Sequence, residues 1–462
     1  MKKELSRLVL YHELGQDPIL KTLAEVTDAV EAEDIDAVRE ICVDRIYDVI
    51  RRLLEIATSY AFNRNLWQDY LTFLLITSEN PFSLTSEKQG IQEGSVRHFA
   101  RQDMETFCRL YMYDFSSLEK KLGIDCFSVI CSYSSVQKRA QNFNKNVSLR
   151  VRETSDTIYD ILKDVQDGDY TTASEAVLQV ISDFYLKYGV GMFGLNRAFR
   201  LGEETEGGLT FEPINNTEEV HLSDLVGYEI QKQKLRENTE AFLRGHRANN
   251  CLLFGDAGTG KSTSIKALIT EYYGEGLRMI ELYKHEMKSL SQVISTVKHR
   301  NYKFIIYMDD LSFEDFEVEY KYLKAVIEGG LESRPDNVLI YATSNRRHLI
   351  KETWNDTSDV DLEKHRGDTL QEKLSLVDRF GISIPYMKPN KKEFLEIVRS
   401  LAARNPDITL PEEELEKEAQ KWEMSHGGFS GRTAQQFINY IAGKEAGKEA
   451  GKEAGKEAEK SQ

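Results

Sequence analysis

The segment "NCLLFGDAGTGKSTSIKALI", residues 250–269, constrains the fold of this chain more than any other. A short apolar run ends at Gly255, helical spacing begins at Lys261, and the pattern G-x-x-x-x-G-K-S joins them. Glycines allow backbone N–H groups to converge on phosphate oxygens, and the N-terminus of a helix adds the positive end of its dipole. The segment therefore predicts a phosphate-binding loop (P-loop) between a strand and a helix.

Two side chains of this loop have specific expected roles. Lys261 supplies a mobile cation for the β- and γ-phosphates of a nucleotide, and Ser262 offers a hydroxyl to Mg²⁺. The chain after the P-loop contains no N-K-x-D element of the kind that GTPases show, which favours adenine. We therefore expect ATP and Mg²⁺ as cofactors. The expected nucleotide contacts in this loop are Gly255, Asp256, Ala257, Gly258, Thr259, Gly260, Lys261, Ser262 and Thr263.

A second short apolar run, Phe304 to Met308, ends in two carboxylates, Asp309 and Asp310. Its length and its Ile and aromatic content are typical of a buried strand. A P-loop needs an acidic strand end beside it, because Mg²⁺ must be held and a water must be aimed at the γ-phosphorus. We expect Asp309, with Ser262, to hold the metal and Asp310 to orient the water. The alternative is a pair of solvated carboxylates.

Hydrophobic spacing divides the 462 residues into regions of different character. Apolar residues first recur at three- and four-residue steps, then short apolar runs alternate with helical stretches, which indicates a mostly parallel sheet covered by helices. The expected domains are a mainly helical N-terminal domain at 1–200, a polar linker at 201–222, an α/β core at 223–388, a helical lid at 389–442 and a GKEA-repeat, low-complexity tail at 443–462. We expect the tail to be solvated, fraying or disordered.

Composition excludes several classes of protein. The net charge of −16 argues against a general polyanion-binding surface. The five cysteines show no paired C-x-x-C spacing, which is typical of reduced thiols in a cytoplasmic protein. No signal peptide or transmembrane helix is expected, because no apolar run approaches the length that a membrane span needs.

Six motifs in a fixed order make residues 223–442 resemble an AAA+ ATPase module. The P-loop and the acidic strand are two of them, and "DLVGYEIQKQKLRENTEAFLRG" resembles the segment that precedes the P-loop and borders the adenine. This resemblance implies that Leu225, Val226 and Gly227 lie against the base. "YATSNRRHL" resembles the sensor-1 strand, which implies that Asn345 helps to hold the water.

The two remaining motifs imply arginine roles. "LSLVDRFGISI" resembles the arginine-finger segment, with Arg379 as the finger, and "GGFSGRTAQQF" resembles the sensor-2 helix, with Arg432 reaching toward the γ-phosphate. Arg379 could instead pair with Asp378 or cap a helix, and Arg432 could be a surface residue. The combination "DDLSF … ATSNRRHLI … DRFG" further resembles a bacterial AAA+ family of unknown biological role.

Two departures from the AAA+ pattern bear on activity. The second acid of the acidic strand is commonly glutamate, whereas Asp310 is one methylene shorter, so hydrolysis could be slow or assisted by Glu314. The sequence "YKHEM" after the second strand lacks the aromatic-apolar-glycine loop of substrate-threading unfoldases. Arg346 and Arg347 offer a further interface or polyanion contact.

These features predict a P-loop NTPase of AAA+ type, with a parallel sheet, a small helical lid and a helical N-terminal domain. The expected function is Mg²⁺-dependent ATP hydrolysis by a homo-oligomer that remodels or loads a protein or nucleic-acid assembly, with no membrane partner. The N-terminal domain would recognise the client. The alternative is a nucleotide-gated binding module that hydrolyses little ATP; a P-loop kinase is a third, less favoured class.

Overall fold

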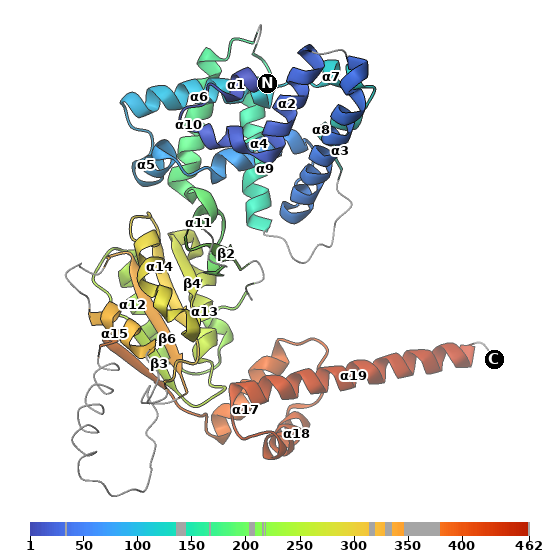
Figure 1. The fold of residues 1–462 in the computed structure, drawn as a ribbon. Coiled ribbons are helices and arrows are strands. Elements are labelled where there is room, and N and C mark those ends of the chain that lie inside the picture. Colours follow the sequence, from blue (N-terminus) through green and yellow to red (C-terminus); the bar gives the residue numbers. More distant parts are fainter. Residues whose placement is uncertain are drawn as a thin grey trace, which may run out of the picture. The chain divides into compact units, whose positions relative to one another are not determined.

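The structure is a computed structural model that describes residues 1–32, 35–134, 145–165, 168–202, 208–214, 217, 219–313, 319–328, 335–345 and 379–460 (Figure 1). Its internal contacts divide the chain into two compact units. The first comprises Met1–Arg197 with Pro213–Asn216, and the second comprises Ala198–Glu212 with Thr217–Gln462. None of the described helices is long and apolar enough to cross a membrane.

The first unit is helical, as the apolar spacing predicts. Its core is rich in aromatic side chains, among them the buried Trp67, whose indole N–H donates a 2.9 Å hydrogen bond to the Leu110 carbonyl. Its α-helices are α1 (Lys2–Leu5), α2 (Pro18–Ala32), α3 (Ile35–Tyr60), α4 (Leu66–Thr77), α5 (Pro81–Gln89), α6 (Ser95–Tyr111), α7 (Ser116–Leu122), α8 (Cys126–Cys131), α9 (Lys145–Leu162), α10 (Thr171–Tyr188) and α11 (Gly191–Leu195).

A seven-stranded sheet forms the centre of the second unit, in the order β2-β1-β4-β5-β6-β3-β7. The neighbouring pairs from β1 to β7 are parallel. This parallel sheet confirms the predicted α/β class. The strands are β1 (Ala198–Leu201), β2 (Phe211–Pro213), β3 (Cys251–Gly255), β4 (Leu277–Glu281), β5 (Lys303–Met308), β6 (Val338–Ser344) and β7 (Ile382–Tyr386).

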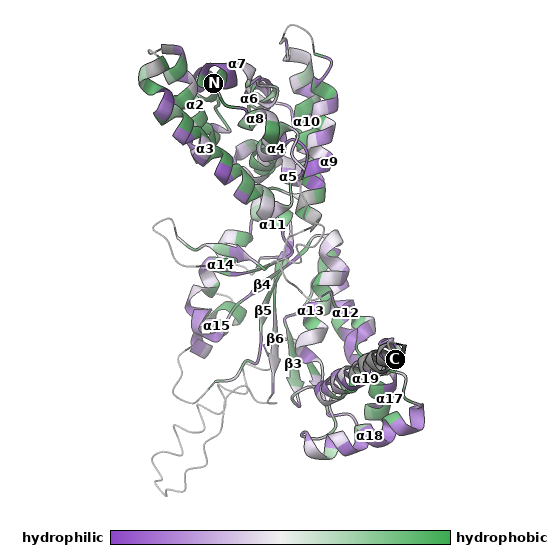
Figure 2. Ribbon diagram, turned by 90° about the vertical axis from the view of Figure 1, so that its right-hand side faces the viewer, coloured by the Kyte–Doolittle hydropathy of each residue, from purple (hydrophilic) through white to green (hydrophobic). Residues whose placement is uncertain are grey.

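Helices cover both faces of this sheet, and three more form the lid. Figure 2 shows α12 and α13 on one face and α14 and α15 on the other. The lid helices pack around their own apolar cluster, which includes Phe394, Leu415 and Phe437. The bounds are α12 (Glu229–Leu243), α13 (Lys261–Tyr272), α14 (Leu290–Val297), α15 (Glu319–Glu328), α17 (Lys391–Ala403), α18 (Glu412–Ser425) and α19 (Gly431–Lys460).

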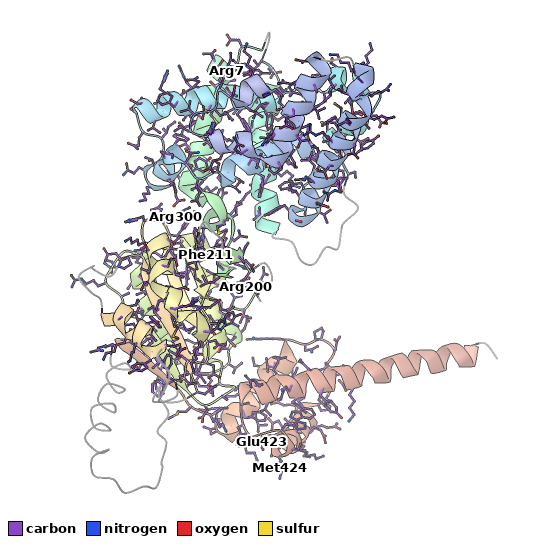
Figure 3. The ribbon with its side chains drawn as sticks, viewed as in Figure 1. Arg7, Arg200, Phe211, Arg300, Glu423 and Met424 are labelled. Atoms are coloured by element: carbon purple, nitrogen blue, oxygen red, sulfur yellow. The ribbon has the colours of Figure 1, made fainter. Side chains whose placement is uncertain are left out.

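Strands β1 and β2 depart from the sequence-based boundaries. The predicted linker at 201–222 includes β2 and the last residue of β1, and both strands join the edge of the sheet. Figure 3 labels Arg200 and Phe211 on these strands; Arg200 lies 3.3 Å from Glu212, and Phe211 is buried. Strands of four and three residues have too few positions for a readable apolar period, so only the long-range pairing defines them.

The GKEA repeat also differs from expectation. Helix α19 begins at Gly431 and continues through the repeat to Lys460, where fraying or disorder was predicted. Lys, Glu and Ala all favour helix, and the preceding turns of α19 are anchored in the lid core, so the glycines do not end the helix.

Candidate nucleotide-binding site

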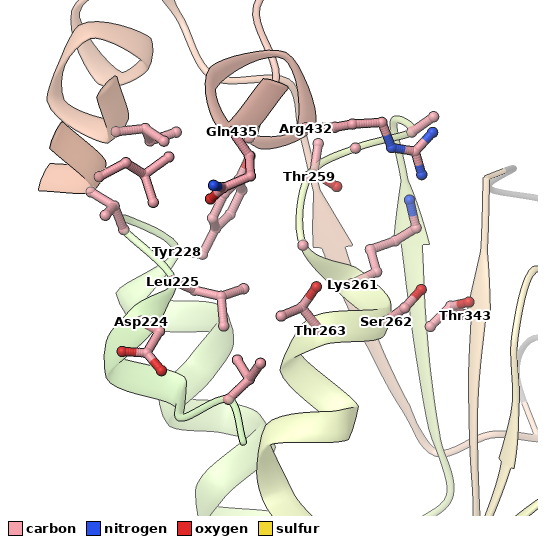
Figure 4. A pocket seen from close by; sticks show the side chains of 18 of the residues that line it. Asp224, Leu225, Tyr228, Thr259, Lys261, Ser262, Thr263, Thr343, Arg432 and Gln435 are labelled. Atoms are coloured by element: carbon pink, nitrogen blue, oxygen red, sulfur yellow. The ribbon is translucent and has the colours of Figure 1, made fainter. Parts of the chain in front are cut away.

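A cavity of about 920 Å³ lies between the carboxyl ends of the strands and the lid (Figure 4). The register aligns Gly255 with Tyr386 and Phe254 with Ser344, so the P-loop and the ends of β6 and β7 share one edge. Most of the predicted site residues line this cavity: Val226, Ala257, Gly258, Thr259, Gly260, Lys261, Ser262, Thr263, Asp309, Asp310, Asn345 and Arg432.

The first residues of the P-loop shape the loop and do not line the cavity. Gly255 has φ 133°, and a Cβ atom there would lie 2.1 Å from the Tyr386 carbonyl oxygen. The N–H of Asp256 donates to that same oxygen at 3.0 Å, and the Asp256 carboxylate accepts a 2.9 Å bond from the Lys388 N–H. Gly255 and Asp256 therefore anchor the loop to β7 and the segment after it.

Lys261 begins α13, and its ammonium group is directed back over the loop. Its Nζ donates to the carbonyls of Gly255 (3.1 Å) and Asp256 (2.6 Å) and to Asn345 Oδ1 (3.0 Å). Burial lowers the pKa of Lys261, and the charges of Asp310, Asp256 and Asp309 act in the opposite direction. The side chain thus carries a cation inside the cavity, held by three oxygen acceptors that phosphate oxygens can replace.

Ser262 and Asp309 form the pair that sequence analysis assigned to the metal. Ser262 Oγ donates to Asp309 Oδ1 at 2.7 Å, and Thr343 Oγ1 donates to the same oxygen at 2.6 Å. Burial would raise the pKa of Asp309, but these hydrogen bonds outweigh it, so the pKa lies below its ordinary value. A hydroxyl beside an ionised carboxylate is an oxygen donor set that fits Mg²⁺, which takes few protein ligands when phosphates complete its shell.

Asp310 has a backbone conformation that suits aspartate better than glutamate. Its φ is 49°, in the left-handed region that Asp and Asn tolerate better than other non-glycine residues. The Asp310 N–H donates to Thr343 Oγ1 at 2.9 Å, which holds this turn.

Asn345 connects Asp310 to the P-loop lysine. Its Nδ2 donates to Asp310 Oδ1 at 2.7 Å, while its Oδ1 accepts from Lys261. This orientation of the amide follows from chemistry, since an ammonium group can only donate and a carboxylate can only accept. Three predicted residues from three separate motifs therefore form one hydrogen-bonded chain.

Arg432 reaches the cavity from the lid. Figure 4 shows its guanidinium group on the same side of the cavity as the Lys261 ammonium group. The Arg432 backbone N–H donates to the Gly258 carbonyl at 3.2 Å, so the start of α19 is bonded directly to the P-loop. A change in the P-loop can therefore be transmitted to the lid.

Arg379 does not line the cavity. It lies at the other end of the strands, three residues before β7. The N–H of Ile382, the first residue of β7, donates to the Asn250 carbonyl just before β3. The five residues of β7 separate it from the P-loop of its own subunit by roughly 16 Å of strand. Asp378, Glu314, Arg346 and Arg347, which the sequence analysis named as alternatives or helpers, lie outside the described residues.

The other end of the cavity is lined by residues that sequence analysis did not assign. Leu225 and Val226, which the AAA+ resemblance places against the base, line the cavity, whereas Gly227 lines an adjoining hollow of about 390 Å³. Tyr228 has φ 60°, its ring stacks on Tyr386 at 5.0 Å, and its hydroxyl donates to the Met387 carbonyl. The unassigned lining residues include Asp224, Tyr228, Thr343, Ile397, Leu401, Arg404, Gln435 and Asn439.

A sequence signal for part of this set exists. Gln435 and Asn439 follow Arg432 at steps of three and four, so all three share one face of α19. Gln435 Nε2 donates to Asn439 Oδ1 at 2.9 Å. Arg404 of α17 ties the lid to the segment before the P-loop by hydrogen bonds to the carbonyls of Ser223 and Asp224, each at 3.0 Å.

Comparison with known proteins gives relatives for this part of the chain. A family described as "Protein of unknown function (DUF815)" matches residues 195–445. The replication factor C large subunit of Methanococcus vannielii is 32% identical over 75 residues, which are 16% of this chain and 15% of that protein. A protein of Methanocaldococcus jannaschii named as a 26S proteasome regulatory subunit homolog is 25% identical over 273 residues, 52% of this chain and 69% of that protein.

Among solved structures, the AAA domain of FIGL-1 in complex with ADP matches 49% of this chain and 74% of its own, with 17% identity and a TM-score of 0.35. The chain thus spans only a small part of the length of the replication factor C relative, and about two thirds of the M. jannaschii relative.

Proposed function

The chain belongs to the family described as "Protein of unknown function (DUF815)" and carries an AAA+ module, and we propose that it is a Mg²⁺-dependent ATPase that works as a homo-oligomer. One observation supports this above all: Lys261, the Ser262–Asp309 pair and the Asn345–Asp310 pair face one cavity at the carboxyl edge of a parallel sheet. That arrangement offers a cation, a metal-ligand pair and a water-orienting acid to one triphosphate.

Binding of ATP uses the P-loop first. Its N–H groups and the N-terminus of α13 bind phosphate oxygens, and Lys261 exchanges its carbonyl contacts for the β- and γ-phosphates. Ser262 and Asp309 are the residues that would hold Mg²⁺, which supplies positive charge at the phosphate oxygens. Val226, Ile397 and Leu401 offer the apolar surface for the base.

Hydrolysis then depends on Asp310. Its carboxylate orients the attacking water and accepts a hydrogen bond from it, while Asn345 holds the carboxylate in place. Arg432 neutralises charge on the γ-phosphate from the lid. Arg379 lies a strand length from the P-loop of its own subunit, so it can act only on nucleotide bound to a neighbouring copy, which is the reason for proposing an oligomer.

The work of this ATPase is the remodelling or loading of a protein or nucleic-acid assembly, with the helical unit as the client-binding part. One curated relative is named as the large subunit of replication factor C and the other as a homolog of a 26S proteasome regulatory subunit. Threading of a polypeptide is not proposed, because Tyr283–Met287 lacks the loop pattern that threading enzymes use.

A second candidate is an ATP-gated binding module. The observation in its favour is the 2.7 Å bond from Asn345 Nδ2 to Asp310 Oδ1, which engages one oxygen of the water-orienting acid. In that case ATP would change the position of the lid through the Gly258–Arg432 bond, and turnover would be negligible.

The test measures ATP hydrolysis as a function of protein concentration for the natural chain, Lys261→Ala and Arg379→Ala. Arg244→Ala is the matched control, since Arg244 is an exposed arginine paired with Glu240 on α12. We expect turnover that rises cooperatively with concentration, is lost in the first two variants and persists in the control.

Each failure has its own meaning. Turnover that survives Lys261→Ala would place hydrolysis outside this cavity and refute the proposed site. Turnover that is independent of concentration and unaffected by Arg379→Ala would refute the shared finger. ATP binding without turnover, removed by Lys261→Ala alone, would favour the gated binding module.

A further inference from the structure

Tyr307 of β5 has a buried hydroxyl group that the mechanism above does not use. The side chain is 1% exposed, and its hydroxyl lies close to Ser262 and Asp309 but forms no hydrogen bond of good geometry within the described part of the chain. The neighbouring polar groups are bonded to one another: Ser262 and Thr343 donate to Asp309, and Asp310 N–H donates to Thr343. A buried hydroxyl without a partner costs folding free energy, so its position calls for an explanation.

The strand geometry places this hydroxyl beneath Asp309. Side chains two residues apart in a strand lie on the same face of the sheet, so Tyr307 and Asp309 face the same helix. That helix is α13, because Lys266 Nζ lies 5.9 Å from the Tyr307 ring centroid and Ser262 is one turn earlier in α13. Burial raises the pKa of Tyr307, and the charge of Asp309 raises it further, which agrees with a protonated hydroxyl close to that carboxylate.

We propose that Tyr307 is a positioning residue for the metal-binding carboxylate: its hydroxyl donates a hydrogen bond to Asp309 when Ser262 becomes engaged with Mg²⁺ and nucleotide. The inference rests on the proposed function, because it needs Mg·ATP at this site. Both bonds that now orient the carboxylate end on Oδ1, and one of the two donors is Ser262 itself. A third donor beneath the carboxylate keeps it oriented after Ser262 turns to the metal.

This role makes Tyr307→Phe an informative variant. Phenylalanine fills the same space and removes only the hydroxyl, so a merely structural role predicts an unliganded protein that is equally or more stable and otherwise unchanged. A positioning role predicts a specific loss in the response to Mg²⁺. The matched control is Tyr341→Phe in the adjacent strand β6, where the hydroxyl is bonded to Asn238 and Thr239 at 2.9 Å each.

The experiment measures ATP affinity of the full chain by calorimetry over a series of free Mg²⁺ concentrations and in EDTA, together with thermal unfolding without nucleotide. For Tyr307→Phe we expect unchanged affinity in EDTA, unreduced unfolding temperature, and a Mg²⁺ midpoint raised about tenfold. Tyr341→Phe should lower the unfolding temperature and leave the Mg²⁺ midpoint where the natural chain has it.

A Tyr307→Phe midpoint equal to that of the natural chain, with normal ATP binding in both, would overturn this inference and leave the proposed function intact. A fall in EDTA affinity and thermal stability together, with no Mg²⁺-specific change, would overturn it in favour of a structural role. Failure of the natural chain to bind ATP with or without Mg²⁺ would refute the proposed function and this inference with it.

Discussion

The helical unit and the α/β unit both bury charged groups, and they use them differently. In the helical unit, Asp103 accepts hydrogen bonds from the backbone N–H groups of residues 9–11, so its carboxylate binds the protein's own backbone. In the α/β unit, the buried Lys261 and the exposed Asp309 and Asp310 line a cavity of about 920 Å³. The void beside Asp103 has a volume of only about 10 Å³. A buried charge therefore indicates ligand chemistry only where space is left beside it.

The contrast also separates what each unit can do. In the α/β unit the polar groups converge because parallel strands end at one edge, so a few short motifs produce a site. In the helical unit the buried polar groups are distributed among helix contacts, as in the 3.0 Å bond between the Tyr11 and Tyr185 hydroxyls. Recognition by the helical unit should therefore depend on its surface.

The largest effect should come from removing the charge of Asp310. Asn tolerates the left-handed backbone at φ 49° and can still contact Asn345, so Asp310→Asn changes the charge and little else. We expect kcat to fall about 1,000-fold, roughly 4 kcal/mol in the barrier, with ATP affinity and thermal stability preserved. Steady-state hydrolysis and equilibrium binding measure the two parts separately. An unchanged kcat would show that the acid at the strand end is not the water-orienting group.

A second effect, confined to the helical unit, is expected from Asp69→Asn. Asp69 is 4% exposed, one of its oxygens has no partner among the described residues, and burial raises its pKa to about 7 against the hydrogen bonds from Ser155 and the Asn63 backbone. The folded unit binds the proton more tightly than the unfolded chain, so unfolding releases it and stability falls as pH rises from about 4 to 7. The loss should reach on the order of 4 kcal/mol by pH 7 and be absent in Asp69→Asn.

Hydrogen exchange of α4 amides between pH 4 and 8 reports this unit separately from the α/β unit. The natural chain should exchange faster relative to the variant as the pH approaches 7, after correction for intrinsic exchange rates. Parallel pH profiles for the two proteins would mean that Asp69 is charged in the folded unit. The helical unit would then hold a buried charge that is not fully bonded, and the two units would differ less in their use of charged groups.

The smallest effect should come from Arg404→Ala in the lid. Arg404 is partly exposed and lies 3.3 Å from the Asp224 carboxylate, so its ion pair is screened and contributes at most about 1 kcal/mol. Its bonds to the Ser223 and Asp224 carbonyls also hold the lid over the cavity. We expect a roughly threefold rise in the Kd for ATP with an unaltered Mg²⁺ midpoint. Arg399→Ala, which removes another partly exposed arginine, paired with Glu412 outside the cavity, is the control.

Sequence analysis located most of the candidate site because its residues lie at the ends of short, strongly patterned segments. Lys261 follows a glycine pattern, Asp309 and Asp310 end an apolar run, and Asn345 ends another. Local spacing decides which strand or helix each residue begins or ends. Parallel pairing of the strands then brings these strand ends together. For the same reason the helical class of the first unit could be predicted, while its client could not.

The tertiary structure decided what local spacing does not encode. Packing between distant segments decides three features: the joining of β1 and β2 to the sheet, the continuation of α19 through the repeat, and the lid residues that line the end of the cavity proposed for the base. The left-handed turn at Asp310, the Asn345 bridge and the unpaired Tyr307 hydroxyl depend on distances of a few ångströms between strands. Sequence by itself determined the kind of site and its chemical groups. Long-range strand pairing and lid packing decided which of those groups touch, because side-chain contacts follow from register and burial that no local pattern contains.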